Sequence, residues 1–507
     1  MNKLNKTNSF WVSLSLAFVL VLGSCSKDFL DTRPVGRVLE VNYYQTQEQA
    51  FESLVSVYDV LQWNDQWGFT MFRFLQNVAS DDTYAGGSDA SDQPSWVAYD
   101  DFSLTPTLGP QRGFWQKCYK GIYRANLYLE RIDGIEDATE QFKVRTKAEA
   151  KFLRAKFYFD LVRLFGNVPF IDHTLGAEEY FTVEQVGPDR VYPLITSDLL
   201  SAIEDLPETV SDNQIGRVTK GAAQALLARV LLFENVESKM DTVAMLCEEV
   251  IQSNQYSLLS SYGDIWSKDG EWSSESVFEI TYSENSTSDW GSFGWGGGEG
   301  NVGVQFIGMR DYNGPTYATG WSFCPISTEL QSDMLGDPRY SQTIIDASTI
   351  PGASYTAGYQ NTGYFMRKYA PLASNVAPDG DPALNWGNNI REIRYADVLL
   401  MAAEGLVRSG GSEGTARDYL NQVRNRVGLP PVTSSGSALL EDIYTERRFE
   451  LATEGHRFFD LLRTGKAQEV LGAIYPSFDV SIHQYLPIPQ QEIDASQGVL
   501  TQNPGYN

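Results

Sequence analysis

The chain has 507 residues, of which 42% are hydrophobic and 21% charged, a balance that is typical of globular proteins. Its 39 basic and 65 acidic side chains give a net charge of −26 at pH 7. This excess of acid disfavours nucleic acid and anionic lipid as electrostatic partners, and it suits a neutral ligand. Aromatic residues make up 13% of the chain, with 11 Trp and 27 Tyr. This aromatic content is high, and a proposed function has to account for it.

Residues 1–24 have the pattern of a secretory signal. Lys3 and Lys6 precede an apolar run that is too short to span a membrane, and the run ends in Leu22-Gly-Ser-Cys25. This ending is typical of a lipoprotein signal, in which the cysteine is acylated and becomes the first residue of the mature chain. We therefore expect Cys25 to carry lipid and residues 25–45 to form a tether. The alternative is an ordinary secretory signal in which the cysteine stands there by chance.

The chain lacks the common motifs of metal sites and catalysis. Its four cysteines include no Cys-x-x-Cys pair, and its three histidines lie far apart. The spacing predicts no disulfide framework, no metal and no cofactor. No nucleophile motif or zinc-protease motif is present, so we nominate no catalytic residue. Asp379-Gly-Asp381 lacks the other ligands of a twelve-residue calcium loop, and we interpret it as a solvated turn.

Apolar residues return every three or four positions along most of the chain, which predicts a mainly α fold. The predicted helices span residues 47–61, 114–132, 142–165, 191–206, 219–234, 242–253, 394–408 and 415–427. Small residues such as Ala222, Ala225 and Ala228 allow neighbouring helices to approach closely. We expect antiparallel helix pairs that resemble tetratricopeptide repeats, although no clean 34-residue period is present.

A stretch with little helical periodicity separates the helical blocks. Residues 256–390 are rich in Gly, Ser, Tyr and Trp, and only 276–282 alternates like a strand. We expect a loop-rich lobe inserted into a helical scaffold of residues 46–255 and 391–507, so that 46–507 form a single domain. The glycines at 291–300 lack the spacing of a phosphate-binding loop, which disfavours nucleotide.

Two loop-rich regions, 62–112 and 256–390, carry most of the tryptophans. Sugars present apolar C–H faces ringed by hydroxyls, so a sugar-binding site needs exposed aromatic rings flanked by polar groups. The aromatic residues that meet this requirement are Trp63, Trp67, Trp96, Trp290, Trp295, Tyr317, Trp321 and Trp386. A single tryptophan is more often core than platform, but we expect two or three of them to form a platform. The predicted ligand-binding residues are Trp96, Trp321, Trp295, Trp290, Trp67 and Tyr317.

Residues 443–466 have the spacing of a helix, but their charges fall on every side of it. Some of these charges must lie against neighbouring elements and need partners there. Equal numbers of acids and arginines favour mutual neutralisation, and hence a structural role, over the raised carboxyl pKa of a glycosidase.

The run from Glu446 to Leu461 resembles the signature of the SusD/RagB family of outer-membrane nutrient-binding lipoproteins. Residues 394–404, 485–493 and 502–506 resemble other segments of that family in the same order. The resemblance implies a helical scaffold of the tetratricopeptide type and a ligand site built from loops of the two tryptophan-rich regions. It also implies a surface lipoprotein without enzymatic activity.

The partner implied by the resemblance is a TonB-dependent transporter barrel of the SusC type in the same outer membrane. The lipoprotein would lie over the barrel, capture an oligosaccharide and deliver it. Two alternatives remain open at this point. One is a member of the same family that binds peptides, and the other is a lipid-anchored glycoside hydrolase on the cell surface.

Overall fold

The computed structural model describes residues 44–64, 69–291 and 298–506, and from Thr46 onward the chain forms one compact unit. Cys25, Trp67 and Trp295 lie outside the described residues. Within those described, no helix is long and apolar enough to cross a membrane.

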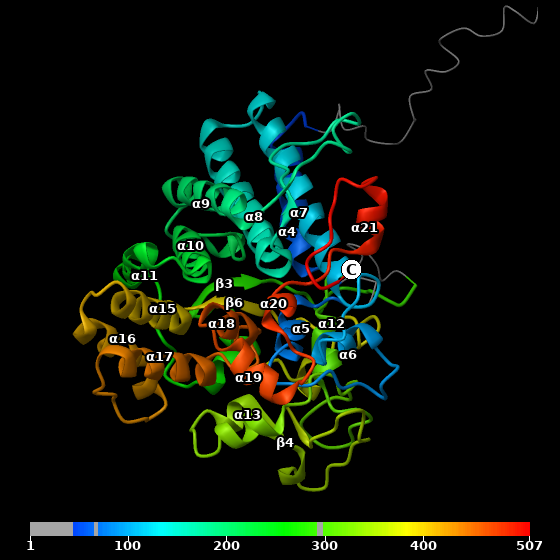
Figure 1. Cartoon of the computed structure of the whole chain (residues 1–507), viewed down its shortest axis with the longest axis vertical. Helices are drawn as coiled ribbons and strands as arrows, with labels where there is room; N and C mark the ends of the chain where they lie inside the picture. The colour runs from blue at the N-terminus through cyan, green and yellow to red at the C-terminus, as the bar shows by residue number, and fades with distance from the viewer. Residues whose placement is uncertain (1–43, 65–68, 292–297, 507) are drawn as a thin grey trace, which may run out of the picture. The chain divides into compact units, whose positions relative to one another are not determined.

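Successive helices pack side by side and build the scaffold (Figure 1). Its main helices are α4 (Gln47–Gln62), α7 (Gln111–Arg131), α8 (Glu140–Phe165), α9 (Pro188–Asp205), α10 (Lys220–Glu234), α11 (Met240–Gln252), α15 (Tyr395–Arg408), α16 (Glu413–Arg426) and α17 (Gly436–Glu450). The chain is therefore mainly α, and the predicted helical-pair scaffold is confirmed.

Small residues allow close packing at one helix crossing in particular. A Cβ added to Gly405 of α15 would lie 2.9 Å from the backbone N of Ala244 and 2.9 Å from the backbone O of Met240, both in α11. Any side chain at this position would push the two helices apart, because real Cβ atoms do not approach backbone so closely. The absence of a side chain at Gly405 therefore permits the close approach of α11 and α15.

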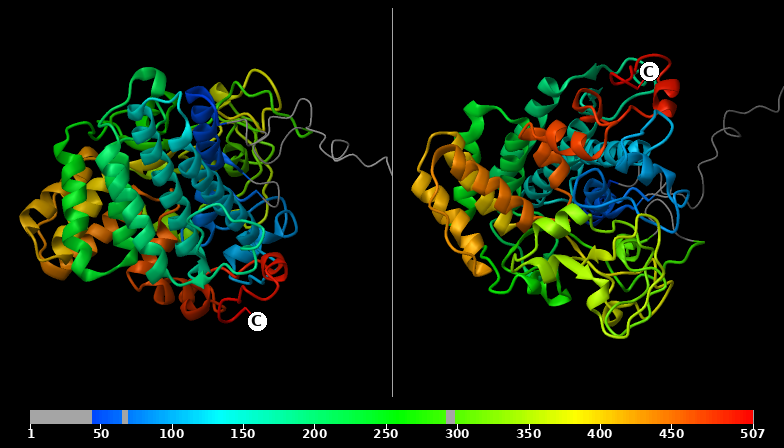
Figure 2. Two further views of the ribbon diagram at one scale, coloured as in Figure 1. Left: turned by 90° about the horizontal axis from the view of Figure 1, so that it is seen from above. Right: turned by 60° about the horizontal axis from the view of Figure 1, so that its bottom comes forward.

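The loop-rich lobe leaves and re-enters the scaffold at one place. Strand β3 (Ser276–Ile280) pairs antiparallel with β6 (Ile390–Arg394), so the ends of the excursion 281–389 lie side by side. The α-helices and strands that the structure describes in this lobe are short, and Figure 2 shows them gathered on one side of the scaffold. They are α12 (Val302–Ile307), α13 (Thr328–Asp333), α14 (Tyr340–Thr343), β4 (Ile344–Asp346) and β5 (Tyr364–Met366).

The first tryptophan-rich region, expected to be loop, contains two short helices, α5 (Phe72–Val78) and α6 (Pro94–Asp100). The segment between them lies against the lobe, where Thr83 pairs with Ile326 and Gly86 with Phe323. Pairing across more than 200 positions brings the two tryptophan-rich regions together. The remaining α-helices and strands are β1 (Val168–Pro169), β2 (Gln185–Val186), α18 (Arg457–Arg463), α19 (Ala467–Ile474), α20 (Val480–His483) and α21 (Gln490–Ala495).

The prediction of one helix over 443–466 is wrong. Helix α17 ends at Glu450, and a turn leads into α18. Thr453 and Gly455 have φ of 65° and 75°, in the left-handed region that ends helices. Gly455 lies against α5: its backbone N donates to Oδ1 of Asn77 at 2.7 Å, and an added Cβ would lie 2.8 Å from the backbone O of Arg73.

The charges of this stretch pack inward as ion pairs, as their distribution predicts. Arg394 is 1% exposed and contacts Glu450 at 3.0 Å and Glu454 at 2.7 Å. Arg339 contacts Glu446 at 2.6 Å and Glu450 at 3.1 Å. We call these five residues the clasp. It joins α17 and the turn after it to β6 and to the lobe.

Candidate functional site

Among the tryptophans that the structure describes, Trp290 and Trp321 lie together. Their ring centroids lie 5.9 Å apart and their planes differ by 30°. Trp290 is 49% exposed and Trp321 is partly buried. Two large rings close to parallel and open to solvent form a platform of the kind that stacks on the apolar face of a flat ligand. We call Trp290 and Trp321 the platform.

A buried layer of aromatic rings supports the platform. Phe306 of α12 lies edge-on to Trp321 at 4.9 Å. Beneath it, the ring of Trp96 stacks on Phe306 at 5.2 Å, with 26° between the planes. Phe323 lies 4.7 Å from Phe306 and 5.2 Å from Trp96. Tightly packed rings of this kind fix the orientation of the platform before a ligand arrives.

Backbone contacts fix the position of Trp321. Its N–H donates to the carbonyl of Gln305 at 3.0 Å. The preceding residue, Gly320, lies so close to Gly308 that an added Cβ would be 2.3 Å from the Cα of Gly308. Only glycine permits this approach. The two segments that contain Gly308 and Gly320 therefore lie in contact directly beside the platform.

One charged pair lies next to the platform. Arg310 donates to the carbonyl of Trp321 at 3.1 Å and contacts Asp92, from the first loop region, also at 3.1 Å. Both side chains are about one quarter exposed, and Nε of Arg310 has no hydrogen-bond partner among the described residues. A guanidinium and a carboxylate beside aromatic rings supply donors and acceptors for ligand hydroxyls.

The structure separates the predicted aromatic residues into different roles. The expectation that Trp96 is exposed is wrong, since its side chain is 0% exposed under Phe306 and Phe323. Trp63 and Trp386 are likewise buried, at 5% and 1%, with indole N–H groups that donate to Asp59 and to Gln305. These three rings belong to the core.

Tyr317 lies apart from the platform. It packs edge-on to Tyr312 at 5.7 Å, in a small separate core with Met309 and Phe365. Burial raises its pKa above the ordinary tyrosine value. Tyr317 therefore packs against a different hydrophobic cluster from the one that supports Trp321.

Sequence reasoning missed Phe69 and Arg310. Phe69 lies 6.5 Å from Trp290 and 6.4 Å from Trp321, edge-on to both. Its φ of 52° is uncommon for a bulky residue and turns the chain just before α5. Neither residue stands in a motif. Phe69 could have been suspected only because it is close in sequence to the tryptophans of the first loop region.

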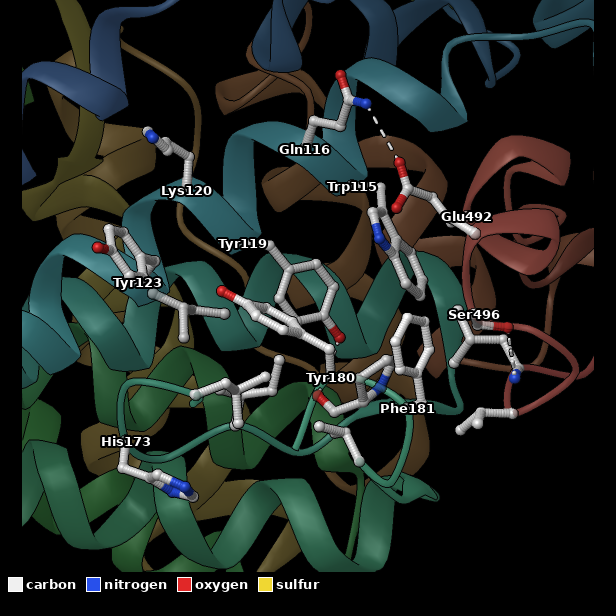
Figure 3. A pocket seen from close by; sticks show the side chains of 18 residues that line it. Trp115, Gln116, Tyr119, Lys120, Tyr123, His173, Tyr180, Phe181, Glu492 and Ser496 are labelled. Carbon is white, nitrogen blue, oxygen red and sulfur yellow. Dashed lines mark hydrogen bonds between the residues drawn. The ribbon is translucent and has the colours of Figure 1, made fainter. Parts of the chain in front are cut away.

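A further cavity lies on the scaffold, and neither Trp290 nor Trp321 lines it. It has a volume of about 720 Å³, and α7, the segment between β1 and β2, and α21 form its walls (Figure 3). Of the predicted ligand-binding residues that the structure describes, Trp96, Trp290, Trp321 and Tyr317, none lines this cavity.

The clasp carboxylates do not have the properties of a glycosidase pair. Burial alone would raise the pKa values of Glu450 and Glu454, but neighbouring cations, Arg394 among them, lower both. This agrees with the predicted neutralisation. Glu446 differs, since burial raises its pKa, yet it is 1% exposed and bound to Arg339. Carboxylates held in this way support a structural role.

These features define a class of protein: a scaffold of paired helices that carries an irregular lobe, with a solvent-exposed aromatic platform on the lobe. A family model described as "SusD family" matches residues 264–506. A second, described as "Starch-binding associating with outer membrane", matches residues 28–232.

The chain belongs to the SusD family. A solved structure titled "Laminarin binding SusD-like protein" is 40% identical and superposes with a TM-score of 0.85 over 91% of this chain and 100% of that one. Surface glycan-binding protein A from Bacteroides thetaiotaomicron, solved with laminarihexaose, is 33% identical with a TM-score of 0.83 over 90% of this chain and 100% of that one. Among sequences, "SusD-like protein P25" of Formosa agariphila is 26% identical over 97% of this chain and 99% of its own length. The resemblance inferred from residues 446–461 is confirmed.

Proposed function

We propose that this chain is a glycan-binding lipoprotein of the cell surface and that its ligand is a laminarin-type glucan. The observation that carries the proposal is the Trp290–Trp321 platform, in a chain 40% identical to a structure titled as laminarin-binding. The alternative ligand of the same chemical class is a starch-type glucan. It is supported by the description of the family model that matches residues 28–232.

The platform suits a glucan for a physical reason. Successive sugar units present apolar faces, and two rings inclined by 30° can each cover one such face along a curved chain. Arg310 and Asp92 stand beside the rings as partners for hydroxyls. A shallow open platform holds a segment of a long polymer without having to enclose its ends.

The test is calorimetric titration of the soluble chain, begun at Ser26, with laminarihexaose and with maltohexaose. Trp290→Ala and Trp321→Ala should each weaken laminarihexaose binding by about tenfold or more, which corresponds to ~1.4 kcal/mol. Trp272→Ala is the matched control, because Trp272 is also partly buried but belongs to no ring contact of the platform. It should bind as the wild type does.

Other results would redirect the proposal. Binding of maltohexaose alone would assign the platform to starch. Binding of neither glucan, with basic peptides bound in their place, would favour the peptide-binding branch of the family. Release of shorter sugars during the titration, followed by chromatography, would indicate a hydrolase and contradict the proposal.

We further propose that Cys25 anchors the chain in the outer membrane and that a TonB-dependent barrel of the SusC type receives the glycan. Acylation at one cysteine with more than one chain gives stable membrane attachment. Cys25→Ser should therefore move the protein from the membrane fraction to the soluble fraction. The intact lipoprotein, extracted in mild detergent, should co-purify with a barrel of that type, and purification of the lipoprotein alone would count against the partnership.

A further inference from the structure

The turn at 379–381 lies against the segment that carries Trp290. The backbone N–H of Asp381 donates to the carbonyl of Ser288 at 3.1 Å. Asn385 is 0% exposed, and its Nδ2 donates to the carbonyls of Ser288 at 2.9 Å and of Asp381 at 2.8 Å. The N–H of Ser288 donates back to Oδ1 of Asn385 at 3.2 Å. One buried amide therefore joins this turn to the chain just before Trp290.

The next residue, Trp386, is bonded to the segment that carries Trp321. Its Nε1 donates to Oε1 of Gln305 at 3.3 Å. Nε2 of Gln305 donates to the carbonyl of Thr319 at 3.1 Å, and the carbonyl of Gln305 accepts the N–H of Trp321 at 3.0 Å. Asn385 and Trp386, neighbours in sequence, are therefore linked by hydrogen bonds to the two segments of the platform. We call Asn385, Trp386 and Gln305 the brace.

Close backbone contacts hold the brace in place. A Cβ added to Gly300 would lie 2.5 Å from the Cα of Asn385, so the two segments touch at a position where only glycine fits. The N–H of Asn301 donates to the carbonyl of Trp386 at 2.7 Å. These contacts fix Asn385 and Trp386 against the chain that leads into α12, the helix to which Gln305 belongs.

We propose that the brace is the positioning device of the glucan site: it sets the separation of 5.9 Å and the inclination of 30° between Trp290 and Trp321 before the ligand arrives. Asn385, Trp386 and Gln305 are 0%, 1% and 6% exposed, so they act through the two rings and not by contact with sugar. Rings that are already ordered lose less conformational entropy on binding. This role rests on the proposed function of the platform.

Removal of the buried amide is the first test. Asn385→Ala should weaken laminarihexaose binding by about tenfold in calorimetric titration of the soluble chain. Asn503→Ala is the matched control: Asn503 is 4% exposed, and its Nδ2 also donates to two carbonyls, those of Phe165 and Leu486. Both variants leave buried carbonyls without a partner and should lose comparable thermal stability, but Asn503→Ala should bind as the wild type does.

Gly380→Ala displaces the brace without removing a hydrogen-bonding group, and it decides the question if Asn385→Ala does not fold. Gly380 has φ of 74°, and an added Cβ would lie 2.6 Å from Nδ2 of Asn385. Gly410 also has φ of 74°, but among the described residues an added Cβ there meets nothing within 4 Å. The two substitutions impose the same backbone strain, so only Gly380→Ala should weaken laminarihexaose binding, by severalfold.

A spectroscopic signature reports the platform itself. Two indole rings with centroids 5.9 Å apart couple their electronic transitions and give paired bands of opposite sign in ultraviolet circular dichroism. The bands that Trp290→Ala removes from the wild-type spectrum define the signature. Asn385→Ala and Gly380→Ala should lose it. Asn503→Ala and Gly410→Ala should keep it, because lower stability alone leaves both rings in place in the folded state.

Three results would overturn the proposal. Wild-type binding and an intact signature in Gly380→Ala would mean that the platform does not depend on the brace. Equal weakening in Asn385→Ala and Asn503→Ala would mean that stability alone governs affinity. A spectrum that Trp290→Ala leaves unchanged would mean that the two rings are not held together in solution. Failure of the proposed function is distinct, since the wild type would then not bind laminarihexaose while the signature still responded to the brace variants.

Discussion

At the scale of single residues, Arg394 shows how a buried charge is used in this protein. It lies 2.8 Å from Glu275, 3.0 Å from Glu450 and 2.7 Å from Glu454, so three carboxylates share one guanidinium. The three carboxylates come from the residue just before β3, from the end of α17 and from the turn after α17. Such an arrangement is costly to break, because each carboxylate stays buried when the cation is removed.

Arg394→Met should therefore lower the free energy of unfolding by roughly 3–5 kcal/mol. The measurement is urea unfolding at pH 7. Lys220→Met is the control: its ion pair with Glu208 is 35% and 56% exposed, so its loss should cost under about 1 kcal/mol. Equal effects of the two substitutions would mean that the clasp does not stabilise the fold.

Substitution of Trp96 and of Trp321 should have different effects, although both tryptophans lie near the same site. The first should lower stability and the second should lower affinity. Trp96→Ala leaves a cavity beneath Phe306 and should cost about 3–5 kcal/mol of stability. Trp321→Ala removes a partly exposed ring and should lower affinity for laminarihexaose far more than it lowers stability. Thermal unfolding and titration, measured on both variants, check this. A Trp96→Phe variant of normal stability that no longer binds would contradict the assignment of Trp96 to the core.

At the scale of elements, the platform depends on the crossing of two lobe segments at Gly308 and Gly320. Replacing Gly320 by Ala would put a Cβ 2.3 Å from the Cα of Gly308, so the segment that carries Trp321 must move. Gly320→Ala should weaken laminarihexaose binding by about tenfold or more, with α-helical circular dichroism unchanged. Gly134→Ala is the control, since an added Cβ there meets nothing within 4 Å. Normal binding by Gly320→Ala would show that the platform tolerates displacement.

At the scale of the whole molecule, Glu392 connects three distant parts of the chain. Burial alone would raise its pKa, but nearby cations hold the pKa at about 2. These cations are Arg73 of α5, Lys156 of α8 and Arg229 of α10. Because this pKa lies below the unfolded value of about 4.3, the ionised carboxylate contributes stability that is complete above pH ~4.3 and is lost as pH falls towards 2.

The unfolding free energies of wild type and Glu392→Gln should therefore differ most above about pH 4.3 and converge as pH approaches 2. Urea unfolding across this range measures the difference. Glu441→Gln, at an exposed side chain in a surface ion pair, should stay close to wild type throughout. A difference between wild type and Glu392→Gln that does not change with pH would contradict the low pKa of Glu392.

Sequence patterns predicted eight of the scaffold helices, from α4 to α16, to within a few residues, because helical spacing is local. For example, α8 was expected over 142–165 and spans Glu140–Phe165. The break between α17 and α18 was missed, although Gly455 was a visible signal. The paired charges of the clasp were predicted from their distribution, but their partners at 275 and 339 were not, because these come from segments far away in sequence.

By itself, the sequence determined the mainly α scaffold, the inserted lobe and membership of the SusD family, since these follow from local spacing and from a contiguous signature. Tertiary structure alone decided which tryptophans face solvent. Trp96 and Trp321 stand in similar loop-rich surroundings in sequence, yet one is covered by Phe306 and Phe323 and the other lies open beside Trp290. The burial of Trp96 depends on neighbours more than 200 positions away, and other long-range contacts bring α7 and α21 together.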